Sequence, residues 1–112
     1  MRIYIAGPYS SDDPCIRVQN VSRAMEVGRE LLRQGHAPFI PHLNHWFDQW
    51  ATNQGITISY DEYMRWGAGY LAVCDGVVYL GSSPGPDREL EYAVRLGKPV
   101  YSCLSERLQV RS

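Results

Sequence analysis

The sequence predicts an α/β domain of the flavodoxin- or Rossmann-like type, with three layers and a parallel sheet of four to five strands. Short apolar runs alternate along the 112 residues with longer segments whose apolar residues recur every three or four positions. This alternation of strands and helices is typical of a parallel sheet that helices cover on both faces. Two loops rich in Gly, Pro and Ser, 7–10 and 81–85, follow the first and third predicted strands.

The first half of the chain provides two strands and a long helix. Residues 2–7 form a short apolar run that ends in Gly-Pro, which predicts a buried strand. Apolar residues at helical spacing through 18–32 predict an amphipathic helix that ends at Gly35. Residues 36–41 predict the second strand. Residues 42–57 have no clean period, and both a short helix and a lid with aromatic contacts remain open there.

The second half adds two helices and two strands. Ser59 and Glu62 have the spacing of a capping box, which predicts the start of a helix. Residues 75–81 predict a third strand, residues 87–96 a helix, and residues 98–103 a fourth strand. The remaining tail is short and polar.

The strand order that this pattern predicts is 2-1-3-4. Right-handed crossovers place the first and third strands side by side in that order. Ligands of such sheets bind outside the carboxyl ends of the strands where the chain reverses direction. The two Gly/Pro/Ser loops fall at those two ends, so they predict one ligand site.

Composition predicts a single domain, residues 1–112, and excludes two classes of partner. The net charge is −1 and no Lys/Arg cluster is present, so we expect no long nucleic acid, although single nucleotides remain possible. No apolar run approaches the ~20 residues that span a bilayer, so we expect no membrane partner. The first residues are too short an apolar run for a signal peptide. The odd cysteine count matches no metal motif and predicts free thiols in a reducing, cytoplasmic compartment.

The segment 79–99 carries the strongest functional pattern. An apolar strand breaks into the second Gly/Ser/Pro loop, which leads directly into a helix whose predicted first turn contains Asp87 and Glu89. Unpaired N–H groups at a helix start bind anions and favour the charged form of a carboxylate. We therefore expect Glu89 to stay ionised beside a small ligand, where it can act as a nucleophile.

Two segments resemble the nucleoside 2-deoxyribosyltransferase superfamily. These are YIAGPYS near the start and DGVVYLGSSPGPDRELEYAVRLGKPV from residue 75. The superfamily includes deoxyribosyltransferases and 2′-deoxynucleoside 5′-phosphate N-hydrolases. The resemblance implies cleavage or transfer of the N-glycosidic bond of a (deoxy)nucleoside or its 5′-monophosphate, without a cofactor.

The resemblance also implies catalytic roles. Glu89 matches the family nucleophile, and Tyr4 matches the tyrosine that orients it. The family often carries an Asp where this chain has Gly67, and that acid helps to protonate the leaving base. Asp61, six residues earlier on the same predicted helix, is the nearest substitute.

The implied substrate-binding residues come from both loops and the segments beside them. Ser83 distinguishes the substrates, since nucleoside-using members carry an acid there and nucleotide-using members a serine, so it favours a 5′-monophosphate. Asp87 argues against a phosphate because it adds negative charge, which Arg88 offsets. The full set is Gly7, Pro8, Tyr9, Ser10, His42, Ser83, Gly85 and Arg88.

Several alternatives remain open. His42 and His45 lack the further ligands that a zinc site needs, so we expect no metal. The aromatic residues of 46–50 either stack on a base or pack in the core or at an interface. The narrow stretch 67–69 predicts close helix packing, and by the resemblance to the family's oligomers we interpret it as a subunit interface, hence a homodimer or higher homo-oligomer. The main alternative to an enzyme is a non-catalytic nucleotide-binding or sensor module, and a weaker one is a scaffold for a protein partner.

Overall fold

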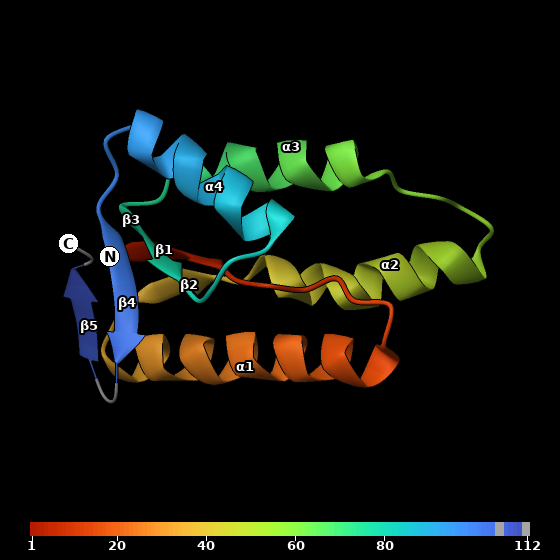
Figure 1. The fold of residues 1–112 in the computed structure, drawn as a ribbon, viewed down its shortest axis with the longest axis horizontal. Coiled ribbons are helices and arrows are strands. Elements are labelled where there is room, and N and C mark those ends of the chain that lie inside the picture. The colour runs from red at the N-terminus through yellow and green to blue at the C-terminus, as the bar shows by residue number, and fades with distance from the viewer. Residues whose placement is uncertain (105–106, 111–112) are drawn as a thin grey trace.

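The structure, a computed structural model, describes the backbone of residues 1–104 and 107–110 and the side chains of residues 1–102. It contains ten elements, which alternate along the chain much as predicted (Figure 1). In chain order they are β1 (Arg2–Ala6), α1 (Pro14–Arg33), β2 (Ala37–Phe39), the 3-10 turn η1 (Pro41–Leu43), α2 (Asn44–Asn53), α3 (Tyr60–Leu71), β3 (Gly76–Tyr79), α4 (Pro84–Arg95), β4 (Val100–Leu104) and β5 (Arg107–Val110).

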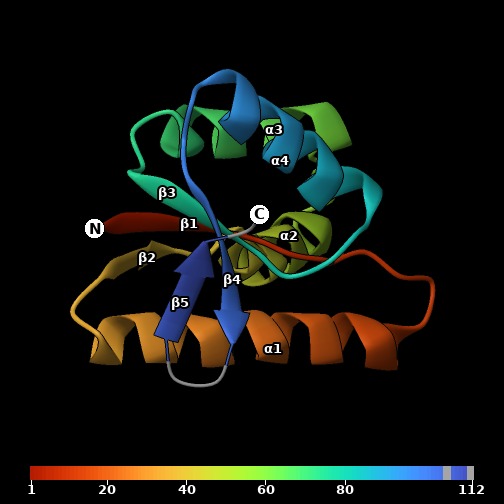
Figure 2. The same cartoon turned by 60° about the vertical axis from the view of Figure 1, so that its left-hand side comes forward.

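The sheet confirms the predicted topology and adds one strand to it. Its order is β2-β1-β3-β4-β5, and the first four strands are parallel. The tail was expected to be a short polar segment, but β5 pairs antiparallel with β4 (Figure 2). The predicted parallel sheet of four strands is therefore confirmed, and β5 adds an antiparallel fifth strand next to β4. A parallel neighbour would need a long crossover, whereas a tight return suffices for an antiparallel one.

Helices cover both faces of the sheet, as predicted. In Figures 1 and 2, α1 lies on one side of the strands, and α3 and α4 lie together on the other. Side chains alternate along β1, so Ile3 and Ile5 pack with α1 while Tyr4 and Ala6 face α3 and α4. This alternation decides the chemistry of the site, because it turns Tyr4 towards α4.

The uncertain segment 42–57 is mostly helical, so the helix alternative was the correct one. Pro41 opens η1, which leads without a break into α2. Helix α2 lies beyond the strands in Figure 1, on the side to which the carboxyl ends of β1 and β3 point. It is therefore positioned beside the predicted ligand site.

Helix α4 begins three residues earlier than predicted. Its first residue is Pro84, and only Asp87 lies in the first turn. Proline suits a helix start because its fixed φ is helical and its missing N–H would be unpaired there anyway. Glu89 consequently lies in the second turn, and the prediction that it belongs to the first turn is wrong.

Candidate functional site

A cavity of about 520 Å³ lies at the carboxyl ends of β1 and β3, which is within the usual size of small-ligand sites. The first loop, η1, α2, α3 and the start of α4 form its walls. Of the residues singled out from the sequence, those that line it are Tyr4, Gly7, Tyr9, Ser10, His42, Ser83, Gly85 and Glu89. The two loops therefore do meet at one site, as the predicted strand order implied.

Tyr4 and Glu89 form a hydrogen-bonded pair at the sheet end of the cavity. The Tyr4 hydroxyl donates to Oε2 of Glu89. Tyr4 is fully buried, and its ring stacks on Phe39 at a centroid distance of 5.4 Å. Burial raises the pKa of Tyr4 far above its ordinary value, so its hydroxyl stays protonated and remains a donor.

The ionisation of Glu89 differs from the sequence expectation. Burial raises the pKa of Glu89 to about 7, and the hydrogen bond from Tyr4 opposes that rise. The N–H groups at the helix start are too far from a second-turn side chain to lower its pKa. Removing the charged carboxylate from water costs free energy, and this raises the pKa. The carboxyl therefore keeps its proton to a higher pH than an exposed glutamate does.

Gly67 of α3 lies directly against this pair. A Cβ atom at this position would stand 2.5 Å from the Tyr4 hydroxyl and 3.6 Å from Oε2 of Glu89. The space where an acidic side chain was sought is thus already filled by the tyrosine. Gly67 is buried within the chain itself, so its contact with Tyr4 accounts for this glycine, while the predicted subunit interface stays a prediction.

His42 anchors the first loop, residues 7–10, through hydrogen bonds to its backbone. Its Nε2 lies 3.0 Å from the Gly7 carbonyl oxygen and 3.2 Å from that of Pro8. Carbonyl groups only accept, so Nε2 carries the proton and Nδ1 does not. Burial lowers the pKa of His42, which keeps the ring neutral. His42 therefore fixes the loop on which Tyr9 stands, and Pro8 contributes its carbonyl to this anchor without lining the cavity.

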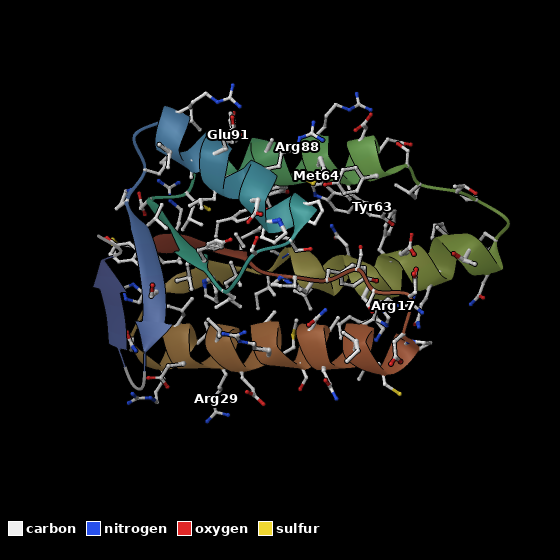
Figure 3. The ribbon with its side chains drawn as sticks, viewed as in Figure 1. Arg17, Arg29, Tyr63, Met64, Arg88 and Glu91 are labelled. Carbon is white, nitrogen blue, oxygen red and sulfur yellow. The ribbon has the colours of Figure 1, made fainter. Side chains whose placement is uncertain are left out.

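The far end of the cavity is made by α2 and α3 and was missed from the sequence. The Tyr9 hydroxyl lies 2.9 Å from Nδ1 of His45, and the Tyr63 hydroxyl donates to Oδ1 of Asp48 at 2.7 Å. Tyr63 and Met64 project from α3 towards α2 in Figure 3. His45 and Asp48 are one turn apart on α2, and that i, i+3 spacing of polar residues was the available signal.

The start of α4 presents few free donors. Ser83 is the N-cap residue and makes no side-chain capping bond, so its hydroxyl is available to the cavity that it lines. Pro84 and Pro86 have no N–H, which leaves the amide of Gly85 as the donor of the first three helical positions. This helix start can therefore donate single hydrogen bonds to a ligand, but it lacks the successive backbone N–H groups that bind an anion such as phosphate.

Asp61 and Arg88 are not among the residues that line the cavity, although both were predicted at the site. Instead they pair with each other at 3.7 Å, and both side chains are more than half exposed. Figure 3 shows Arg88 on the side of α4 next to α3. The predictions that Asp61 replaces the acid at position 67 and that Arg88 contacts the ligand are therefore not supported by this geometry.

The aromatic residues of α2 pack on the outer side of the helices. Phe47 stacks on Trp50 and meets Trp66 edge-on, with ring centroids 5.9 Å and 5.3 Å apart. Trp46 lies edge-on to His45 at 5.4 Å. None of these three α2 aromatics is among the residues that line the cavity. The α2 aromatics thus lie outside the cavity, and because Trp46 and Trp50 are each 53% exposed, they are not core residues and an interface role stays a prediction.

Within residues 1–102, no three side chains of His, Cys, Asp or Glu come together in a group that could hold a metal ion. Among the helices described, none combines the length and apolar composition needed to cross a membrane.

Comparison with solved structures shows the fold of the 2-deoxyribosyltransferases. The enzyme of the psychrotolerant bacterium Bacillus psychrosaccharolyticus is 23% identical with a TM-score of 0.58, over 97% of this chain and 77% of the other. The enzyme of Leishmania mexicana is 19% identical with a TM-score of 0.59, over 99% of this chain and 78% of the other. No curated protein matches the sequence. A family model described as "Domain of unknown function (DUF7768)" matches residues 1–103, and the chain therefore belongs to this family.

Proposed function

We propose that the protein cleaves or transfers the N-glycosidic bond of a (deoxy)nucleoside or its 5′-monophosphate, with Glu89 as the nucleophile. The observation that carries the proposal is the Tyr4–Glu89 pair in a ligand-sized cavity at the switch point of the sheet. The shared fold of the 2-deoxyribosyltransferases supports the same reaction class. Fold alone does not determine chemistry, so the argument rests on the site.

The reaction follows from the chemistry of a fixed carboxylate. The ionised Glu89 attacks the anomeric carbon, and the bond to the base nitrogen breaks with its electron pair leaving on the base. Water or a second base then attacks the glycosyl ester and frees the carboxylate. Tyr4 holds one carboxylate oxygen, which leaves the other to attack.

The cavity also suggests the direction in which the substrate lies. The sugar must sit at Glu89, so the base extends towards the polar pairs of α2 and α3. His45 and Asp48 offer a ring nitrogen and a carboxylate oxygen that the Tyr9 and Tyr63 hydroxyls leave available. A base with both donors and acceptors on its edge suits that end.

The choice between nucleoside and nucleotide depends on the start of α4. Ser83 favours a phosphate, but the prolines leave the Gly85 amide as the free helix-start donor. No Lys or Arg is among the residues that line the cavity, whereas Asp48 and Glu89 are. A phosphate would meet little positive charge there, so a nucleoside is the better substrate and the monophosphate the alternative.

The test is base release from a panel of nucleosides and 5′-monophosphates, followed by chromatography, with and without a second base. Wild-type protein should release base, and Glu89→Gln should not. Asp87→Asn is the matched control because it removes an exposed carboxylate from the same helix. Release by Glu89→Gln at the wild-type rate would contradict the proposal.

A non-catalytic binding module is the second candidate, because position 67 carries no acid. Under this alternative, calorimetry would detect nucleoside or nucleotide binding while no base is released. Binding accompanied by release that depends on Glu89 decides for the enzyme.

We also propose that the chain forms a homo-oligomer. This proposal rests on exposed aromatic side chains and not on the glycine stretch 67–69. Trp46, Trp50 and Tyr70 are each about half exposed, which is unusual for large aromatic side chains on α2 and α3. Light scattering on the purified chain measures the assembly, and a monomer at all concentrations would remove this part.

A further inference from the structure

Helix α3 contains two glycines, Gly67 and Gly69, which are separated by a single residue. Glycine in a helix interior is destabilising relative to alanine, so each needs a reason. A Cβ atom on Gly69 would meet nothing within 4 Å, whereas one on Gly67 would stand 2.5 Å from the Tyr4 hydroxyl oxygen. Real Cβ atoms do not approach so closely, so only Gly67 has a contact that excludes a side chain.

We propose that Gly67 is a positioning residue for Glu89: its missing side chain leaves the space in which the Tyr4 hydroxyl reaches the carboxylate. This deepens the proposed function, on which its catalytic meaning rests. The contact joins three residues from three elements: Tyr4 of β1, Gly67 of α3 and Glu89 of α4.

The tyrosine cannot make room by moving aside. Its ring stacks on Phe39, and Phe39 stacks in turn on Tyr70 of α3 with centroids 4.4 Å apart. Tyr4 is fully buried in β1, one of the two inner strands of the four parallel ones. A side chain at position 67 therefore displaces the hydroxyl from Glu89 or strains the packing of α3 on the sheet.

The contact is with the hydroxyl and not with the ring. The next atoms that a Cβ would meet are Oε2 of Glu89 at 3.6 Å and Cζ of Tyr4 at 3.7 Å, both at ordinary van der Waals distance. Removal of the hydroxyl by Tyr4→Phe should therefore make alanine acceptable at position 67. An aspartate at position 67 would have the same Cβ conflict, so Gly67→Asp is not expected to restore an acid to the site.

The experiment is a double-mutant cycle of Gly67→Ala and Tyr4→Phe, with Gly69→Ala as the matched glycine control. The readout is the titration midpoint of Glu89, followed by NMR of carbon-13-labelled glutamate carboxyl groups and assigned by its loss in Glu89→Gln. This readout requires no substrate, so it can fail or succeed independently of base release. Melting temperatures are recorded for every variant.

The hydrogen bond from Tyr4 lowers the pKa of Glu89, so its loss should raise the midpoint above the wild-type value of about 7. Gly67→Ala should raise it by about as much as Tyr4→Phe, and the double variant should add little to Tyr4→Phe. Gly69→Ala should leave the midpoint unchanged and raise the melting temperature slightly.

Three results would overturn the proposal. One is an unchanged Glu89 midpoint in Gly67→Ala. Another is an equal further shift when Gly67→Ala is added to Tyr4→Phe. If Gly67→Ala does not fold, the folding of the double variant decides, because rescue by Tyr4→Phe supports the hydroxyl conflict and failure to rescue contradicts it.

Discussion

Asp87 and Glu89 lie two residues apart on α4, yet the fold treats the two carboxylates in opposite ways. Asp87 is exposed and accepts hydrogen bonds from Tyr79 at 2.5 Å and Ser82 at 2.6 Å, which lower its pKa. Glu89 points inward, where burial raises its pKa to about 7. Two positions along a helix rotate a side chain by more than half a turn, so one carboxylate stabilises the loop while the other enters the cavity.

We expect the largest effect on activity from Glu89→Gln, and a much smaller one from Asp87→Asn. Glu89→Gln should lower kcat/KM for base release by about 10³-fold or more, because it removes the nucleophile and keeps the shape. Asp87→Asn should change it by less than about tenfold, since it acts only through loop stability. Steady-state kinetics on the best substrate of the panel measure both, and equal losses would end the distinction between them.

Tyr4→Phe should have the next largest effect. Loss of a hydrogen bond to a charged group costs about 1.5–3 kcal/mol, which corresponds to a fall in kcat/KM of roughly 10- to 100-fold. Because Tyr4 acts through Glu89, the pH at which activity is half-maximal should rise as well. A loss of activity with an unchanged pH profile would instead indicate a purely structural role.

The pH dependence of activity and of stability in the wild-type protein tests the assigned ionisation of Glu89. Activity should rise with pH through about 7, because only ionised Glu89 attacks. Stability should run the other way: the folded chain holds the Glu89 proton more tightly than the unfolded chain, whose pKa is near the ordinary 4.5. The contribution of Glu89 to stability is therefore complete below pH 4.5 and is lost as the pH rises to about 7.

Glu89→Gln isolates this contribution from that of His42, whose lowered pKa makes the fold less stable as the pH falls below 6.5. The variant should have a higher melting temperature than wild type at pH 8, with a smaller difference at pH 5. A constant difference across this range would mean that Glu89 titrates at its ordinary pKa in the fold.

The smallest expected effect concerns Asp87. Asp87→Asn should lower the melting temperature by a few degrees at pH 7, because a neutral amide accepts more weakly from Tyr79 and Ser82. The lowered pKa means that the ionised form still stabilises the fold at pH 3.8, so the difference should disappear only below that pH. Thermal unfolding followed by circular dichroism at pH 7 and pH 3 checks both statements.

The sequence predicted the elements that have a regular period and the place where their loops meet. The apolar runs and helical spacings located four strands, and the strand order then brought Gly7 and Ser83 to one cavity. The capping box of Ser59 and Glu62 is present as expected, with both of its hydrogen bonds formed. Local patterns of this kind fix local structure and, through the topology rules, its approximate arrangement.

The errors lie where long-range contacts outweigh local signals. Gly67 looked like the place of an absent acid, but only the position of Tyr4, 63 residues away, explains why no side chain fits there. Glu89 looked like an acid at a helix start, and only the true start at Pro84 and the packing of α4 show that it is partly buried in the second turn. The α2 end of the cavity had no clean period from which it could be predicted.

The antiparallel strand β5 covers the edge of the sheet that β4 would otherwise expose to neighbouring molecules. A parallel sheet that stopped at β4 would offer a row of unpaired backbone groups to a neighbouring molecule, whereas β5 satisfies that side of β4. Its own outer side spans only four residues, and β2, the opposite margin, spans three. Both margins are short, and short edge strands limit how a sheet edge pairs with a neighbouring molecule.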